Sequence, residues 1–248
     1  MVYGIEQCFT TESEDGSGNA PTGAINGKFT INEDGNQVYF SQGNLQYIGS
    51  ANTPYWKFAE HQWDNLSVTT GQNSSDQNVD RDLFGWGTSG YHYSGDQYNV
   101  NYQPWSTSSS TIDQDYNYFG YGPSTNMLSQ DLTGSSVWYD WGVHNAISNG
   151  GNKAGIWRTL TKDEWVYVFN TRSTTSGVRY AKAKVSNKNG VILLPDDWRT
   201  SYYALSNTNT SAASFSSNII SASQWNILEQ YGAVLLLADR KSGSAGMP

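Results

Sequence analysis

Hydrophobic and polar positions in the second half of the chain indicate a short helix after residue 161. Residues 161–164, Thr-Lys-Asp-Glu, have the pattern of a capping box. In such a box the threonine hydroxyl accepts a hydrogen bond from the amide three residues later, and the glutamate carboxylate accepts one from the threonine amide. Trp165, Val168 and Phe169 follow at intervals of three and four residues. This spacing predicts a helix with one apolar face that ends near residues 171–173.

A second capping box predicts another helix near the end of the chain. Ser221 and Gln224 occupy its two ends, and Trp225 and Leu228 supply the apolar positions. Gly232 follows, where glycine commonly ends a helix. We expect the core to contain the tryptophans that flank the regular elements of this half: Trp157, Trp165, Trp198 and Trp225.

Short apolar and alternating runs predict strands around these helices. Residues 28–31 and 37–41 flank a glycine-containing turn and predict a β-hairpin. Residues 178–185 and 191–194 flank Asn189-Gly190, a dipeptide typical of hairpin turns, and predict a second hairpin. The other predicted strands are residues 45–48, 55–58 and 233–238. Helix, hairpin, loop, helix and strand in this order predict an α+β fold.

Residues 83–145 carry many large aromatic side chains among Gly, Ser, Asn and Thr, without a helical or strand period. Residues 66–80 and 199–220 are polar and predict loops. Long irregular connections are uncommon and often functional, so we expect the aromatic segment to form loops pinned by its rings. The alternative is a poorly ordered segment, or rings that serve as anchors alone. The candidate ligand-binding residues are Trp86, Tyr91, Tyr93, Tyr98, Tyr102, Trp105 and Tyr118.

Charge is distributed unevenly along the 248 residues. Residues 1–152 carry 16 acidic and 3 basic side chains, and residues 153–248 carry 6 acidic and 11 basic ones, for a net charge of -8. An acidic surface repels phosphate backbones, and the basic residues of 179–188 alternate with apolar ones as on a half-exposed strand. We therefore exclude nucleic acid as a partner. No apolar run reaches the length of about 18 residues that a membrane span requires, so membrane insertion is not expected.

The ends of the chain differ in composition from its middle. Residues 10–23 are acidic and rich in turn-forming residues, and residues 1–10 lack the basic region and apolar run of a signal peptide. We expect a flexible leader over residues 1–23, a single domain over residues 24–238 and a disordered tail over residues 239–248.

Cysteine and histidine offer little for metal binding. Cys8 is the single cysteine of the chain, which excludes an intrachain disulfide and a cysteine metal cluster. His61, His92 and His144 lack the spacing of a helical metal site, and we assign them to surface or loop positions.

Two carboxylate patterns have a chemical and a structural interpretation. The pattern Asn78-x-Asp80-x-Asp82 resembles the start of a calcium loop, but Leu83 replaces the expected glycine. Calcium bound by Asn78, Asp80 and Asp82 is thus one candidate, an ordinary polar turn the other, and no further metal or cofactor is expected. Asp196 and Asp197 follow a proline in a turn, where short carboxylates accept hydrogen bonds from nearby amides, so we expect a structural role.

Several motifs together resemble a known family. They are residues 157–165 (WRTLTKDEW), 169–172 (FNTR), 190–198 (GVILLPDDW) and 225–229 (WNILE), with weaker similarity in 23–29 and 43–47. This set resembles the FISUMP-like (major paralogous domain) proteins of gut Bacteroidales, which are related to the formylglycine-generating-enzyme branch of the C-type-lectin fold. The resemblance covers most of residues 23–235. It implies a C-type-lectin-like α+β domain with two short helices, β-hairpins and long aromatic-rich loops, at the cell surface or outside the cell. Family members usually carry an export signal and continue past the last predicted strand, so a C-terminally truncated chain is expected.

The resemblance also bears on function. Formylglycine-generating enzymes bind copper through two cysteines, which Cys8 alone cannot supply, so we do not expect an enzyme. We expect a non-catalytic recognition or adhesion module that binds a glycan or protein ligand through its aromatic, Asn- and Asp-rich loops. The alternatives are an enzyme on the same scaffold, of the oxidase or sulfatase-modifying kind, and a structural subunit of a surface assembly. The sequence leaves the oligomeric state open.

Overall fold

A computed structural model describes residues 9–10, 20–66, 78–82, 84, 89 and 131–238. The chain divides into two compact units. Unit 1 comprises the described residues of Asn44–Ala59 and Asn65–Thr161, and unit 2 those of Phe9–Gly43, Glu60–Asp64 and Lys162–Pro248. Short helices and small sheets occur together, which confirms the α+β class. One domain over residues 24–238 stays a prediction.

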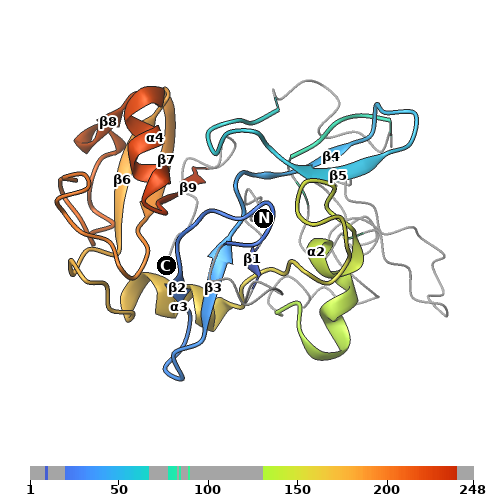
Figure 1. The fold of residues 1–248 in the computed structure, drawn as a ribbon, viewed down its shortest axis with the longest axis horizontal. Coiled ribbons are helices and arrows are strands. Elements are labelled where there is room, and N and C mark those ends of the chain that lie inside the picture. The colour runs from blue at the N-terminus through green and yellow to red at the C-terminus, as the bar shows by residue number, and fades with distance from the viewer. Residues whose placement is uncertain are drawn as a thin grey trace, which may run out of the picture. The chain divides into compact units, whose positions relative to one another are not determined.

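Unit 1 combines a hairpin with a short helical segment (Figure 1). Strand β4 (Leu45–Ile48) pairs antiparallel with β5 (Tyr55–Phe58), and both predicted strands are confirmed. The 3-10 helix η2 (Gly134–Tyr139) and α2 (Trp141–His144) lie where no regular period was predicted. Helices of six and four residues are too short to produce a recognisable hydrophobic period, which explains the difference.

The core of unit 1 is rich in aromatic rings. Trp56 packs against Phe84 with ring centroids 5.1 Å apart, and Phe58 meets Trp157 edge to face at 4.7 Å. Trp157 is fully buried, as predicted. Its Nε1 donates a hydrogen bond to the carbonyl oxygen of Gly150 at 2.7 Å, so the buried indole leaves no polar atom unsatisfied.

The first sheet of unit 2 contains the predicted N-terminal hairpin. Strands β2 (Phe29–Thr30) and β3 (Gln37–Phe40) pair antiparallel, with Phe29 opposite Val38. Strand β1 (Phe9–Thr10) pairs with the other edge of β3. The sequence placed these two residues in the flexible leader, because two residues give no detectable strand pattern.

The second sheet of unit 2 has four strands in the order β8-β6-β7-β9. They are β6 (Tyr180–Val185), β7 (Lys188–Leu193), β8 (Ile219–Ile220) and β9 (Val234–Leu237). Strand β8 runs parallel to β6, and the other pairs are antiparallel. Both β8 and the 3-10 helix η3 (Phe215–Ser217) lie in a segment that was predicted to be a loop.

Helices α3 (Lys162–Asn170) and α4 (Ala222–Gln230) each begin directly after the first residue of a predicted capping box. Both reciprocal bonds of the second box are present between Ser221 and Gln224. At the other end of α4, Gly232 has a φ of +84°. The amides of Gly232 and Ala233 donate to the carbonyl oxygens of Glu229 and Leu228 at 2.9 and 3.0 Å, the pattern of a Schellman motif.

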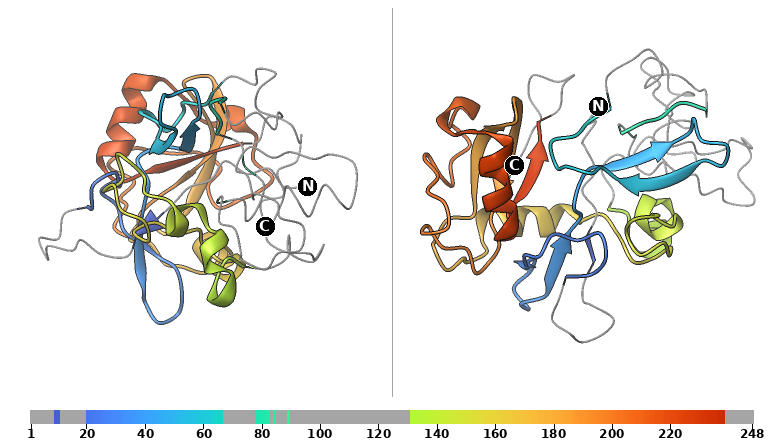
Figure 2. Two further views of the ribbon diagram at one scale, coloured as in Figure 1. Left: turned by 90° about the vertical axis from the view of Figure 1, so that its right-hand side faces the viewer. Right: turned by 45° about the horizontal axis from the view of Figure 1, so that its top comes forward.

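The tryptophans of unit 2 differ in burial. Trp225 on α4 is fully buried, and Figures 1 and 2 show α4 lying along the four-stranded sheet. Trp198 is also buried, as predicted. Trp165 on α3 is only half-buried, so its assignment to the core was wrong. Val168 and Phe169 take the buried positions of α3, and the Trp165 ring lies beside them, 5.9 Å from the ring of Phe169.

The hairpin between β6 and β7 is confirmed, but the predicted turn was wrong. Ser186 and Asn187 form the turn, with φ of 45° and 65°, as a two-residue type I′ turn requires. Asn189-Gly190 lies inside β7. A Cβ atom at Gly190 would lie 2.7 Å from the Leu235 side chain of β9. The glycine is therefore needed for the close approach of the neighbouring strand.

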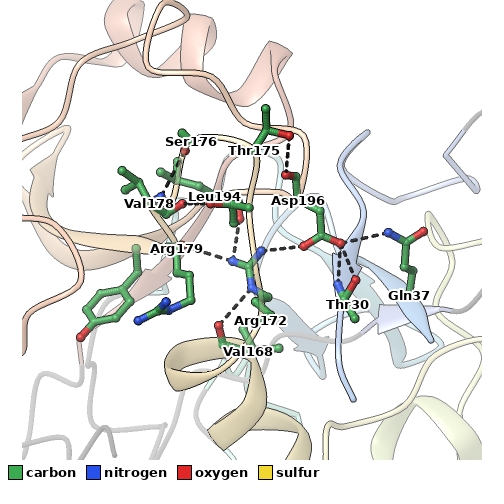
Figure 3. Close-up of polar contacts among 12 residues, drawn as sticks. Thr30, Gln37, Val168, Arg172, Thr175, Ser176, Val178, Arg179, Leu194 and Asp196 are labelled. Atoms are coloured by element: carbon green, nitrogen blue, oxygen red, sulfur yellow. Dashed lines mark hydrogen bonds and ion pairs between the residues drawn. The ribbon is translucent and has the colours of Figure 1, made fainter. Parts of the chain in front are cut away.

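Arg172 follows α3 and connects the parts of unit 2 (Figure 3). Its side chain is fully buried. Nε donates to Val168 O at 3.0 Å, Nη2 donates to Arg179 O at 3.2 Å and Leu194 O at 2.6 Å, and Nη1 pairs with Asp196 Oδ1 at 2.9 Å. One guanidinium therefore joins the last turn of α3, the residue before β6 and the residue after β7.

Asp196 extends this network to the first sheet of unit 2. Its Oδ2 accepts hydrogen bonds from Thr30 N at 2.8 Å, Thr30 Oγ1 at 2.7 Å and Gln37 Nε2 at 2.9 Å (Figure 3). Burial lowers the pKa of Arg172, and the carboxylate of Asp196 acts in the opposite direction by raising it. Asp196 therefore has the structural role expected of it.

Replacing Asp196 by Ala leaves the buried guanidinium without its counter-charge. We expect the D196A substitution to lower the free energy of unfolding by about 3–5 kcal/mol, as for other buried pairs that lose one partner. Urea denaturation followed by tryptophan fluorescence measures the change. The neighbouring Asp197 is exposed and provides the control, because D197A should change stability by less than about 0.5 kcal/mol. Equal effects of the two substitutions would contradict the central role of the Arg172–Asp196 pair.

The position of Gly190 can be tested in the same assay. We expect Gly190→Ala to cost about 1–3 kcal/mol, because the added methyl group meets β9. Asn189→Ala at the exposed preceding position should have little effect. If Asn189-Gly190 formed the turn, Asn189→Ala would be damaging as well, because both central residues of a type I′ turn need a positive φ.

Candidate functional site

The structure describes both ends of the segment that carries the candidate ligand-binding residues. At its start Phe84 is buried. The Ser89 hydroxyl donates to Trp138 O at 2.8 Å, and Ser89 O accepts a hydrogen bond from Asn145 Nδ2 at 2.7 Å. At its end Leu132 is buried. Ser89 is therefore hydrogen-bonded both to η2 and to Asn145, the C-cap residue of α2.

The candidate rings themselves fall within residues that are not described. They are Trp86, Tyr91, Tyr93, Tyr98, Tyr102, Trp105 and Tyr118. Their assignment to ligand binding stays a prediction, and the site is defined here by the residues at its base.

Trp138 is an exposed aromatic residue at this base that the sequence did not single out as a site. It lies on η2 with 51% of its surface accessible. Ser136 and Tyr139 are buried on the opposite side of the same helix, and Ser135 is exposed. Residues three apart lie on the same face of a 3-10 helix, so Ser135 and Trp138 are neighbours on the exposed face of η2. A six-residue helix is too short for a hydrophobic period, so no sequence signal identified Trp138.

Asp140 fixes the orientation of the helical segment. Its carboxylate is buried and caps α2, with Oδ1 accepting a hydrogen bond from Gly142 N at 3.0 Å. Oδ2 accepts one from Thr159 N at 2.6 Å. Burial raises the pKa of Asp140 to about 6, although these hydrogen bonds act in the opposite direction. A single carboxylate thus connects the base of the aromatic segment to residues 157–160.

The proposed calcium ligands make contacts of a structural kind. Asp80 Oδ1 accepts a hydrogen bond from Ser50 N at 2.9 Å, and the fully buried Asp82 accepts one from Leu66 N. Asn78 is exposed. Among the residues that the structure describes, no group of three or more His, Cys, Asp and Glu side chains is arranged to hold a metal ion. Calcium binding by this segment stays a prediction.

Two of the three histidines are described. His61 is exposed and stacks on Trp63 with ring centroids 4.8 Å apart. His144 ends α2 and is half-buried, and burial lowers its pKa. They belong to different units. His92 lies outside the described residues.

Comparisons of the chain with models of protein families, with characterised proteins and with solved structures give no match. The resemblance to FISUMP-like proteins therefore stays a prediction. Within the described part of the chain, no helix has both the length and the apolar character needed to cross a bilayer.

The raised pKa of Asp140 predicts a pH-dependent stability. The folded chain binds this proton more tightly than the unfolded chain, because the pKa rises from 3.8 to about 6 on folding. The contribution of Asp140 to the free energy of unfolding should therefore be greatest below pH 3.8, and roughly 3 kcal/mol should be lost as the pH rises through 6.

Urea denaturation across this pH range, with Asp140→Asn as the comparison, measures this contribution. Subtracting the stability of Asp140→Asn from that of the wild type at each pH removes the contribution of His144. That contribution rises with pH, because folding lowers the pKa of His144. An identical pH dependence in the two proteins would show that Asp140 is not the titrating group.

Proposed function

We propose that this chain is a C-type-lectin-like domain related to FISUMP-like proteins that recognises a glycan or protein ligand without catalysing a reaction. It would act at the cell surface or outside the cell, as the sequence resemblance implies. The observation that carries the proposal is the base of the aromatic segment. There Ser89 is held by two hydrogen bonds beside the half-exposed Trp138.

The arrangement suits recognition for a physical reason. Binding residues on loops are most effective when a rigid scaffold positions them. Here the scaffold is the aromatic core of unit 1, with Phe84 packed between Trp56 and Trp141 at 5.1 and 6.0 Å. Large rings such as Trp138 lose little conformational entropy when they bind and offer both an apolar face and a polar edge.

Four of the described carboxylates make structural contacts. Asp80, Asp82, Asp140 and Asp196 each accept hydrogen bonds from backbone amides. These contacts hold the fold together, whereas a general base needs an acceptor atom directed at a substrate. An enzyme on this scaffold would have to use other residues.

A glycan array followed by titration of the best ligand tests the proposal. We expect Trp138→Ala and Trp105→Ala each to weaken binding about tenfold or more, which is the loss of one good aromatic contact. Tyr55→Ala is the matched control, because Tyr55 is an aromatic residue of unit 1 with 40% exposure that lies on β5. Its substitution should leave the affinity unchanged.

Two results would count against this function. One is ligand binding that survives both tryptophan substitutions. The other is self-association of the purified chain with no ligand bound on the array, which would favour a structural subunit of an assembly.

A further inference from the structure

Two tyrosines from distant positions stack face to face in unit 2. The rings of Tyr202 and Tyr231 have centroids 3.9 Å apart and an interplanar angle of 3°. The two ring faces are therefore in van der Waals contact, for which the optimal separation of carbon atoms is about 3.5–4.0 Å. Tyr231 is 39% exposed and Tyr202 is half-buried. The pair is thus in direct contact and open to small molecules from the solvent.

Other tyrosines of the described chain have partners of a different kind. Tyr47 packs against Trp56, and Tyr180 packs against Phe169, in both cases edge to face with ring centroids 5.3 Å apart. Of the ring contacts between described residues, only the stack in unit 2 joins two tyrosines. Chemistry that requires two phenol groups in contact is therefore directed to this pair.

The backbone and the core hold both rings in position. Tyr231 is the C-cap of α4, and its amide donates to Leu228 O at 3.1 Å. The Tyr202 amide donates to Arg199 O at 3.0 Å. Trp198 is buried and contacts the Tyr202 ring edge to face, with centroids 5.6 Å apart. Because the two rings are already oriented, a reaction between them needs no encounter by diffusion.

We propose that Tyr202 and Tyr231 are a site of oxidative cross-linking, where two equivalents of a one-electron oxidant convert the pair into dityrosine. Each phenol gives one electron to the oxidant and its hydroxyl proton to water, which leaves two phenoxyl radicals. The unpaired electron of each radical is shared with the ring carbons ortho to the oxygen, and one C–C bond forms between two such carbons. The ring hydrogen at each end of this bond then moves through water to the phenolic oxygen. The product keeps both hydroxyl groups and has lost two electrons and two protons.

Contact between the rings favours this bond over a bond between two molecules. Reactants that are held together have a high effective concentration, and the exposed ring of Tyr231 gives the oxidant access to the pair. The bond would join the end of α4 to the turn that begins at Arg199. It would also close a loop over residues 202–231, which restricts the unfolded chain as a disulfide does.

This inference does not rest on the proposed function. Both tyrosines belong to unit 2, and the reaction needs neither a bound ligand nor the aromatic segment of unit 1. Failure of either proposal therefore leaves the other unaffected.

Photo-oxidation of the full chain at micromolar concentration, with ruthenium(II) tris-bipyridine and persulfate, tests the proposal. Size-exclusion chromatography in denaturant first removes chains that are linked to one another. Trypsin then releases residues 200–240 as one peptide, and Glu-C cuts this peptide after Glu229, between the two tyrosines. In mass spectrometry we expect the two parts to remain joined, with two hydrogen atoms missing from their summed mass.

Tyr202→Phe and Tyr231→Phe should each lower the yield of the joined peptide about tenfold or more, because phenylalanine retains the ring contact but cannot form a phenoxyl radical. Tyr203→Phe is the matched control. Tyr203 is a half-buried neighbour of Tyr202 in the same peptide, and its substitution should leave the yield unchanged. Circular dichroism shows whether each variant folds.

Oxidation of the wild type in concentrated urea tests whether the folded contact is needed. We expect the yield of the joined peptide to fall about tenfold or more, because unfolding separates the two rings. The proposal is overturned if the folded wild type gives no joined peptide, or if the yield is equal in urea. It is also overturned if Tyr203→Phe abolishes the joined peptide while Tyr202→Phe retains it.

Discussion

The buried guanidinium of Arg172 imposes the strictest condition on the structure of unit 2. Removing a charge from water costs several kcal/mol unless the protein replaces both the counter-charge and the hydrogen bonds. Asp196 supplies the charge, and three carbonyl oxygens from α3 and the ends of β6 and β7 accept the other hydrogen bonds. Because these acceptors belong to different elements, the condition is met only when helix, hairpin and the first sheet have the observed arrangement. The surfaces that unit 2 presents are positioned by this arrangement.

Side-chain amides form hydrogen bonds with the backbone of short strands, where a neighbouring strand is missing. The Gln62 amide accepts a hydrogen bond from Leu235 N at 2.6 Å and donates to Ala233 O at 3.3 Å, as a neighbouring strand would do for β9. In unit 1, Asn149 exchanges the same two kinds of bond with the backbone of Phe58. Buried strand edges need such partners. Here the side chains of asparagine and glutamine supply these partners in place of a further strand. This is consistent with a chain that has many polar uncharged residues and few charged ones.

Each unit carries an exposed aromatic residue on an ordered element of the backbone: Trp138 on η2 and Tyr231 at the end of α4. Trp138 stands beside Ser89 at the base of the aromatic segment, and Tyr231 stands on Tyr202 and Trp198. Rings fixed in advance contribute affinity because little motion is lost on binding.

The sequence by itself determined the features that depend on neighbouring residues. The two helix starts, the stop at Gly232 and the strands β4, β5 and β9 all followed from capping residues and short apolar runs. The tertiary structure alone decided the turn at Ser186–Asn187, the partial exposure of Trp165, the burial of Asp140 and the pairing of Tyr202 with Tyr231. The reason is that these depend on residues brought together from distant positions. The sequence around Gly190 is typical of a turn, and only the packing of β9 against it shows why glycine is needed there. No local pattern shows which face of the six-residue helix η2 is exposed to solvent.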